Sequence, residues 1–124
     1  MERSKILVVD DEPGLVRLLT LNLERMARFD VLTVVDATQA LEAVVKFRPD
    51  LVLLDWVMPK LSGGDVAQQI RSDSRVCGTR ILFLSAIILK GDAPLELAGC
   101  PAIAKPIGLN ELIDSIDEQL RKVA

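Results

Sequence analysis

The chain has 124 residues, of which 50% are hydrophobic and only 3% aromatic, and it carries a formal net charge of −3. This length suits one domain with a mainly aliphatic core, over residues 1–124, and the mild negative charge gives no electrostatic reason to expect binding to nucleic acid. The longest nearly apolar stretch, Ile81 to Leu89, is far shorter than the roughly 20 residues of a membrane span. No signal peptide fits before the first predicted strand. We therefore expect a cytoplasmic protein with no membrane contact.

The N-terminal half of the chain alternates short, mainly apolar runs with stretches that keep a helical rhythm. Lys5–Val9 and Val31–Val35 are predicted strands, because each run is rich in β-branched or aliphatic residues and is followed at once by an aspartate. Between them, apolar residues at a 3.6-residue spacing predict a helix from about Pro13 to Arg28. A second helix, capped by Asp36, is predicted to run to Phe47.

The C-terminal half continues the same alternation and brings the predicted total to five strands and five helices. Its elements are predicted at Leu51–Leu54 (strand), through Val66 and Ile70 (helix), at Arg80–Leu84 (strand), at about Ala93 to Ala98 (short helix), at Ala102–Ala104 (strand) and from Leu109 to about Lys122 (helix). The third strand is apolar on both faces, as in a central strand that helices cover from both sides. The pattern therefore predicts an α/β fold, a doubly wound parallel sheet with right-handed crossovers.

Polar side chains lie at the carboxyl ends of several predicted strands. They are Asp10, Asp11, Asp55, Ser85 and Lys105. In open parallel sheets the functional crevice lies beyond these strand ends. Like charges about 4 Å apart repel by roughly 4 kcal/mol at an effective dielectric near 20, so three neighbouring carboxylates are expected only where a cation binds. The sequence thus predicts a metal site that contains a reactive carboxylate.

The whole pattern resembles the receiver domain of bacterial two-component response regulators, and the resemblance covers nearly the entire chain. The motifs that carry it are Val8-Val9-Asp10-Asp11-Glu12, Asp55-Trp56-Val57-Met58-Pro59 with Gly63, Ser85-Ala86, and Lys105-Pro106. The resemblance implies the flavodoxin-like strand order 2-1-3-4-5, with five helices on two faces of the sheet.

The resemblance also implies a role for each acidic residue. Asp55 corresponds to the phospho-acceptor, whose carboxylate forms an acyl phosphate. Asp10 and Asp11 correspond to the acidic pair that holds Mg²⁺, together with Asp55 and the backbone carbonyl of Val57. Mg²⁺ prefers hard oxygen ligands, which this set provides.

The remaining motif residues are expected to contact the phosphoryl group. By the resemblance, Lys105 pairs with a phosphoryl oxygen, and the bond from Lys105 to Pro106 is expected to be cis. Ser85 corresponds to the hydroxyl that bonds the phosphoryl group, and the small Ala86 leaves room for the phosphate to enter.

Two features depart from the family pattern. Many receivers have a tyrosine or phenylalanine three residues before the lysine, where this chain has Ala102, and the chain contains no tyrosine at all. The aromatic part of the usual switch is therefore absent. Val57 and Ile87 occupy positions that often help or hinder the hydrolytic water, and both are apolar. We therefore expect a slowly hydrolysing phospho-form.

The function expected from these features is that of a receiver that accepts a phosphoryl group on Asp55 from a histidine kinase or a histidine phosphotransfer protein and signals by protein contact. It would not be an enzyme beyond its own phosphorylation and dephosphorylation, and it cannot be the donor because it has no histidine. Two alternatives stay open, a binding module that keeps this fold without phosphorylation and an Mg²⁺-dependent aspartyl phosphohydrolase. The second would need another aspartate where Val57 stands. Whether the chain acts alone or belongs to a longer regulator also stays open.

Overall fold

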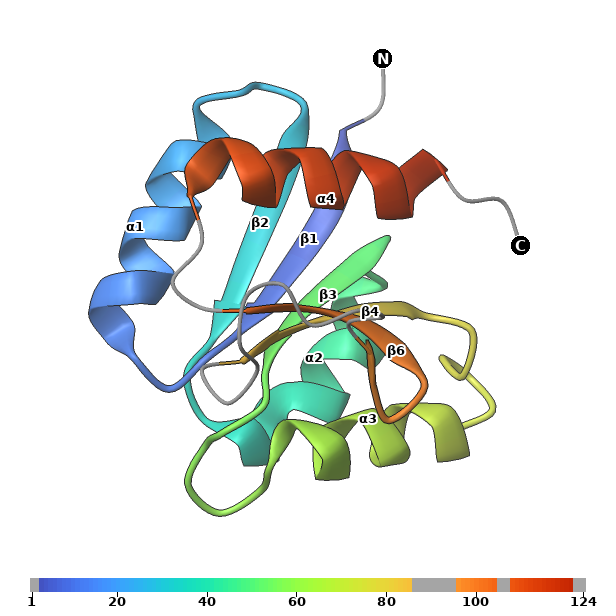
Figure 1. Ribbon diagram of the computed structural model, residues 1–124. Coiled ribbons are helices and arrows are strands. Elements are labelled where there is room, and N and C mark those ends of the chain that lie inside the picture. The colour runs from blue at the N-terminus through green and yellow to red at the C-terminus, as the bar shows by residue number, and fades with distance from the viewer. Residues whose placement is uncertain (1–2, 86–95, 105–107, 122–124) are drawn as a thin grey trace.

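The computed structural model describes residues 3–85, 96–104 and 108–121, and its centre is a six-stranded sheet in the order β2-β1-β3-β4-β6-β5 (Figure 1). The parallel strands are β1 (Ser4–Val9), β2 (Phe29–Val34), β3 (Leu51–Asp55), β4 (Arg80–Ser85) and β6 (Cys100–Ala104). The sixth strand, β5 (Glu96–Leu97), is antiparallel to β6. The predicted parallel order is confirmed, with β6 as its fifth strand.

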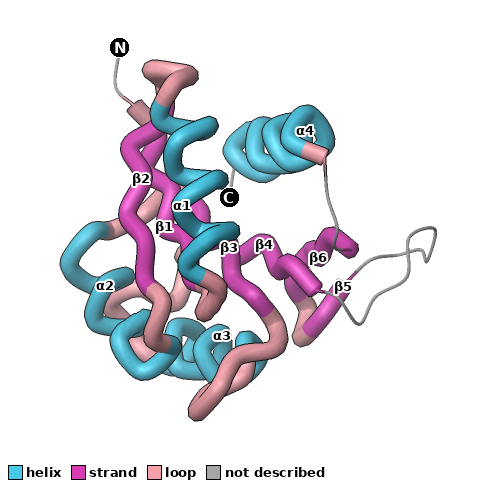
Figure 2. Tube along the Cα trace, turned by 90° about the vertical axis from the view of Figure 1, so that its left-hand side faces the viewer, coloured by secondary structure: helices cyan, strands magenta, loops and turns pink. Residues whose placement is uncertain are grey.

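Helices cover both faces of this sheet, as the alternating pattern predicted. They are α1 (Pro13–Glu24), α2 (Ala40–Phe47), α3 (Gly63–Ser72) and α4 (Leu109–Arg121), with a short 3₁₀ turn, η1 (Ala37–Gln39), before α2. Figures 1 and 2 show α1 and α4 on one side of the sheet and α2 and α3 on the other. None of the helices in the described ranges is both long enough and apolar enough to cross a bilayer.

The two faces of the sheet form two separate hydrophobic cores because side chains alternate along each strand. In β1, Ile6 and Val8 join the core beneath α1 and α4, whereas Leu7 and Val9 join the core beneath α2 and α3. Every residue of β3 is buried, which confirms its predicted central place. Rigid central strands of this kind fix the positions of whatever residues follow them.

The expected fourth helix is wrong for the part of it that the structure describes. Glu96–Leu97 forms a strand that pairs with Cys100 and Pro101 instead of continuing a helix to Ala98. Ala98 and Gly99 both have positive φ, 50° and 77°, as in the two-residue turns of tight hairpins. The described residues therefore contain four α-helices rather than five.

The first helix also ends earlier than predicted, at Glu24 rather than Arg28. Ala27 adopts a left-handed conformation with φ of 58°, which a continuing helix cannot accommodate. The carbonyl of Arg28 already accepts a hydrogen bond from the N–H of Ser4 in β1, at 2.9 Å. The chain must therefore leave the helix by residue 27 in order to join the sheet.

Candidate functional site

Three carboxylates meet at the carboxyl edge of the sheet, between β1 and β3. These strands are parallel neighbours with Val9 opposite Leu54, so the residues that follow them emerge side by side. Carboxylate oxygens of Asp10, Asp11 and Asp55 lie within 4.8 Å of one another. Asp10 and Asp55 are buried, with 1% and 4% of their surface exposed, and Asp11 is half-buried. The structure thus brings together the three acidic residues that the sequence singled out.

Asp10 also organises the turn that leads into α1. Its N–H donates to the carbonyl of Val34 at 3.1 Å, which continues the β1–β2 ladder by one residue. Its carboxylate accepts the N–H of Glu12 at 3.0 Å, a local bond typical of aspartate in turns. The carbonyl of Glu12 then accepts the N–H of Val16 and begins the helix. Asp10 therefore has a structural role as well as its place in the acidic cluster.

The loop after Asp55 is held at both ends by backbone hydrogen bonds. The N–H of Trp56 donates to the carbonyl of Leu84 at 3.0 Å, and the N–H of Gly63 donates to the carbonyl of Trp56 at 2.8 Å. A Cβ atom on Gly63 would lie 2.4 Å from the Asp55 carbonyl oxygen, so only glycine fits there. Ser62 and Asp65 form a reciprocal capping box at the start of α3. These contacts fix the backbone that carries the Asp55 side chain.

Ser85 lies at the same edge of the sheet, on the strand next to Asp55. Asp55 is opposite Leu84 in the β3–β4 register, so Ser85 comes one residue further along β4, and it is fully buried. In the next pair, Ser85 is opposite Ala104 of β6.

Three predicted site residues cannot be compared with the structure. Ala86, Lys105 and Pro106 lie outside the described residues, and the expected cis bond lies there too. The last described residue of β6, Ala104, is opposite Ser85 and lies at the same edge of the sheet as Asp55.

Val57 is the other predicted metal-site residue, through its backbone carbonyl. It lies two residues after Asp55 in the loop, and 58% of its surface is exposed. The Val57 side chain is therefore largely open to solvent.

An aromatic contact beneath the site was not anticipated from the sequence. Trp56 is half-buried and meets Phe83 edge to face, with ring centroids 5.0 Å apart. Phe83 is opposite Ala102 of β6. In the sequence, the feature that pointed to this contact was Phe83, two positions before Ser85. Only the fold shows that the Trp56 ring packs against the Phe83 ring.

An ion pair connects the loop after β3 to a neighbouring turn. Lys60, which has φ of 72°, places its Nζ atom 3.4 Å from a carboxylate oxygen of Asp36. The pKa of Asp36 is lowered, mainly because the Thr38 hydroxyl and N–H donate to its carboxylate, and Lys60 adds to the effect. This pair joins the loop after β3 to the turn after β2, which also ends at the carboxyl edge of the sheet.

Comparison with known proteins places these features in one family. A family model described as the response regulator receiver domain matches residues 6–117. The DNA-binding response regulator MtrA of Mycolicibacterium smegmatis is 40% identical over 122 residues, which cover 97% of this chain and 52% of that protein. The DNA-binding dual master transcriptional regulator RpaA of Synechocystis is 32% identical over 123 residues, 95% of this chain and 49% of that protein. The chain therefore spans about half the length of these relatives.

Solved structures show the same fold. The beryllofluoride-activated N-terminal receiver domain of Klebsiella pneumoniae RstA superposes with a TM-score of 0.82 at 26% identity, covering 96% of this chain and all of that one (100%). The response regulator domain of Thermotoga maritima CheB superposes with a TM-score of 0.83 at 24% identity over 99% of this chain and 100% of its own. At that identity the second likeness concerns the fold alone.

Proposed function

The chain belongs to the response regulator receiver domain family, and we propose that it is a phosphorylatable receiver with Asp55 as its phospho-acceptor. Response regulators partner with histidine kinases, so the phosphoryl donor would be the phosphohistidine of a kinase or of a phosphotransfer protein. The observation that carries this proposal is the meeting of Asp10, Asp11 and Asp55 within 4.8 Å at one edge of the sheet.

The donor set fits Mg²⁺. Three carboxylates supply hard oxygen atoms, and both buried members sit on backbone that the central strands hold rigidly. Asp10, Asp11, Asp55 and the backbone carbonyl of Val57 would hold the ion. When bound, Mg²⁺ supplies positive charge that offsets the negative charge of the carboxylates and the incoming phosphoryl group.

In the proposed reaction, a carboxylate oxygen of Asp55 attacks the phosphorus atom of the donor phosphohistidine. The new O–P bond forms as the P–N bond breaks, and the imidazole nitrogen keeps the electron pair of that bond. The Ser85 hydroxyl would donate a hydrogen bond to a phosphoryl oxygen, and the Lys105 ammonium would pair with another. Ala86 would leave space for the group. Val57 and Ile87 are apolar and cannot hydrogen-bond an attacking water, which favours a long-lived acyl phosphate.

The proposed output is contact with another protein and not turnover of a substrate. The chain would act as an enzyme on itself alone, in gaining and losing one phosphoryl group. DNA binding is part of the names of relatives about twice as long as this chain, and the net charge of −3 gives these 124 residues no general attraction to DNA.

Mass spectrometry after incubation with acetyl phosphate and Mg²⁺ tests the proposal. We expect the wild-type chain to gain the mass of one phosphoryl group, the Asp55→Asn variant to gain none, and an Asp114→Asn variant, changed at an exposed aspartate of α4, to behave as wild type. Modification of Asp55→Asn at the wild-type level would refute Asp55 as the acceptor.

A binding module that keeps the fold without phosphorylation is the second candidate, and the strand at Glu96–Leu97 with the alanine at position 102 favours it. Beryllofluoride with Mg²⁺ distinguishes the two functions. Trp56 follows the acceptor directly and contacts Phe83, so we expect its fluorescence to change on titration if the site accepts a phosphoryl mimic. A flat titration, together with no gain of mass from acetyl phosphate, would favour the binding module.

A further inference from the structure

A groove lies at the amino edge of the sheet, where the strands begin, between the start of β2 and the end of α4. Its volume of about 420 Å³ is within the range of about 300–1,000 Å³ that is typical of ligand sites. The charged residues that line it are Arg3, Arg28, Arg121 and Asp117. Cationic side chains therefore outnumber carboxylates in this groove, although the chain as a whole has a net charge of −3. The groove lies at the opposite end of the strands from the acidic cluster.

Asp117 is neutralised within the groove and holds Arg28 in place. The Nη1 and Nη2 atoms of Arg28 donate to the two carboxylate oxygens of Asp117, at 2.7 and 3.1 Å. The guanidinium carbon of Arg28 lies 4.8 Å from the centre of the Phe29 ring, and the Arg28 carbonyl accepts the N–H of Ser4. A guanidinium group that is fixed in this way has further N–H groups with which to bind a second anion, and little freedom is lost when it does so.

Arg3 and Arg121 can also turn to an anionic partner. Nη1 of Arg3 lies 3.3 Å from a carboxylate oxygen of Asp30, but the two side chains are 54% and 48% exposed, and such exposed pairs contribute little. Arg121 is exposed, and it forms no ion pair with a carboxylate of residues 3–85, 96–104 or 108–121. The charges of these two arginines are therefore available at the surface.

Two further arginines near this edge donate to backbone carbonyls and not to carboxylates. Nη1 of Arg80 donates to the carbonyl of Leu120, which lines the groove, at 3.4 Å. Nη1 of Arg48 donates to the carbonyl of Arg75 at 2.7 Å, between the segments that precede β3 and β4. A neutral carbonyl does not cancel the charge of a guanidinium group, so the positive field extends beyond the groove along this edge of the sheet.

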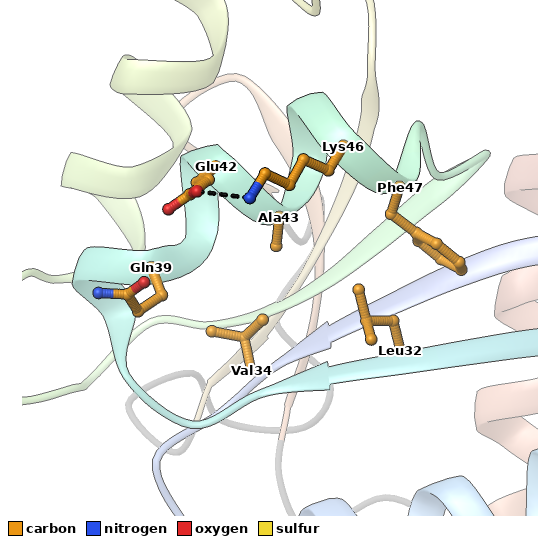
Figure 3. A pocket seen from close by; sticks show the side chains of 7 residues that line it. All are labelled: Leu32, Val34, Gln39, Glu42, Ala43, Lys46 and Phe47. Carbon is orange, nitrogen blue, oxygen red and sulfur yellow. Dashed lines mark ion pairs between the residues drawn. The ribbon is translucent and has the colours of Figure 1, made fainter.

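The groove on the α2 side of β2 shows no comparable preference for charge. It is lined by Leu32, Val34 and Phe47, among others, and the two charged residues at its rim are Glu42 and Lys46. These two form an ion pair of 2.7 Å with each other (Figure 3). The lining of that groove therefore does not select a charged partner, whereas the lining of the amino-edge groove does.

We propose that the amino-edge groove binds an acidic segment of a partner protein, in which carboxylates flank an apolar side chain. The carboxylates would accept hydrogen bonds from Arg3 and Arg121, in the two-pronged geometry that Asp117 already shows with Arg28. The apolar side chain would cover the half-buried Leu120. A short acidic segment suits the site better than DNA or an anionic membrane, because the net charge of −3 repels an extended surface of many negative charges.

Fluorescence anisotropy with a labelled Glu-Glu-Leu-Glu-Glu peptide tests the proposal. We expect this peptide to bind the unphosphorylated chain and a Lys-Lys-Leu-Lys-Lys peptide not to bind. Changing Arg3→Gln and Arg121→Gln together should raise the dissociation constant by at least about tenfold. The matched control is Arg17→Gln, which removes the charge of an exposed arginine of α1 outside the groove and should bind as wild type does. Circular dichroism and thermal unfolding establish that each variant is folded.

Competition experiments test the class of partner. Raising the salt concentration should weaken the peptide complex, because salt screens the charges of exposed arginines. A peptide that does not bind at low salt, a double variant that binds as wild type does, or an equal loss in Arg17→Gln would each overturn the proposal. Tighter binding of a DNA duplex or of phosphatidylserine vesicles through the same arginines would also overturn it, since the groove would then bind phosphate groups. These outcomes are independent of whether Asp55 accepts a phosphoryl group.

Discussion

Among the described glycines, Gly63 leaves the least room for an added Cβ atom. A Cβ atom there would lie 2.4 Å from the Asp55 carbonyl oxygen and 2.8 Å from the Trp56 Cα atom, and backbone atoms cannot swing aside as side chains can. We expect Gly63→Ala to lower the free energy of unfolding by about 1–3 kcal/mol, the usual cost of overpacking. Urea denaturation measures the change. The control is Gly14→Ala, where no heavy atom beyond the adjacent residues and the backbone of α1 lies within 4 Å of the added carbon, and a helix gains from alanine. Equal stability of the two variants would contradict this account of the loop.

Val57 is the residue that we expect to govern the lifetime of the phospho-form. It is 58% exposed, two residues after the acceptor, and its side chain cannot orient a water molecule. A carboxylate or amide at this position can accept a hydrogen bond from an attacking water. Val57→Glu and Val57→Asn should therefore speed dephosphorylation by about tenfold. This increase is smaller than the full rate gain that a well-positioned general base can give. Phosphate release from the purified phospho-protein measures the rate. Val57→Ala serves as the control and should leave it near wild type. Decay at the wild-type rate in the polar variants would show that this position does not affect the water.

At the scale of elements, the sequence predicted the buried strands and the acidic cluster well for a shared physical reason. An apolar run that is buried on both faces has few alternative structures, and the parallel register then determines which residues emerge together at its end. The meeting of Asp10, Asp11 and Asp55 followed from that logic. Two other features depend on distant contacts that a local pattern does not contain, the early end of α1 and the hairpin at Glu96–Leu97. Neither the left-handed conformation of Ala27 nor the pairing with β6 is visible in composition or periodicity.

The loop between α3 and β4 contains a charge pair whose strength depends on pH. Two guanidinium nitrogens of Arg75 donate to the Asp73 carboxylate, at 2.9 and 2.6 Å, and the Arg75 N–H donates at 3.0 Å. These bonds lower the pKa of Asp73 to about 2, from an ordinary value near 3.8. A carboxyl group whose pKa is lower in the folded state stabilises the fold above its unfolded pKa. That stabilisation is lost as the pH falls from about 4 toward 2.

A carboxyl NMR titration tests this pair. We expect the pKa of Asp73 to lie well below its ordinary value in the wild-type chain and to return toward that value in Arg75→Gln, which removes the charged donor. The stability difference between wild type and Asp73→Asn should be constant near neutral pH and should shrink below about pH 4, where the carboxylate takes up a proton. An Asp73 pKa that is unchanged in Arg75→Gln would mean that other groups lower it.

At the scale of the whole molecule, the acidic cluster sets the proposed function against the stability of the fold. The carboxylate oxygens lie within 4.8 Å of one another, and two charges at that distance repel by about 3–4 kcal/mol at an effective dielectric near 20, although solvent around the half-buried Asp11 weakens this. We therefore expect Asp11→Asn to unfold with a free energy about 1 kcal/mol higher than wild type when a chelator removes divalent ions. With Mg²⁺ at a hundred times its dissociation constant, wild type should gain about 2.7 kcal/mol, whereas the variant should gain far less because it has lost a ligand. The order of stability would then reverse on adding the ion. Denaturant unfolding with chelator and with Mg²⁺ measures all four values. The control Asp114→Asn, changed at an exposed residue of α4, should respond to Mg²⁺ as wild type does. If Asp11→Asn gained as much from Mg²⁺ as wild type, the ion would not bind at this cluster through Asp11.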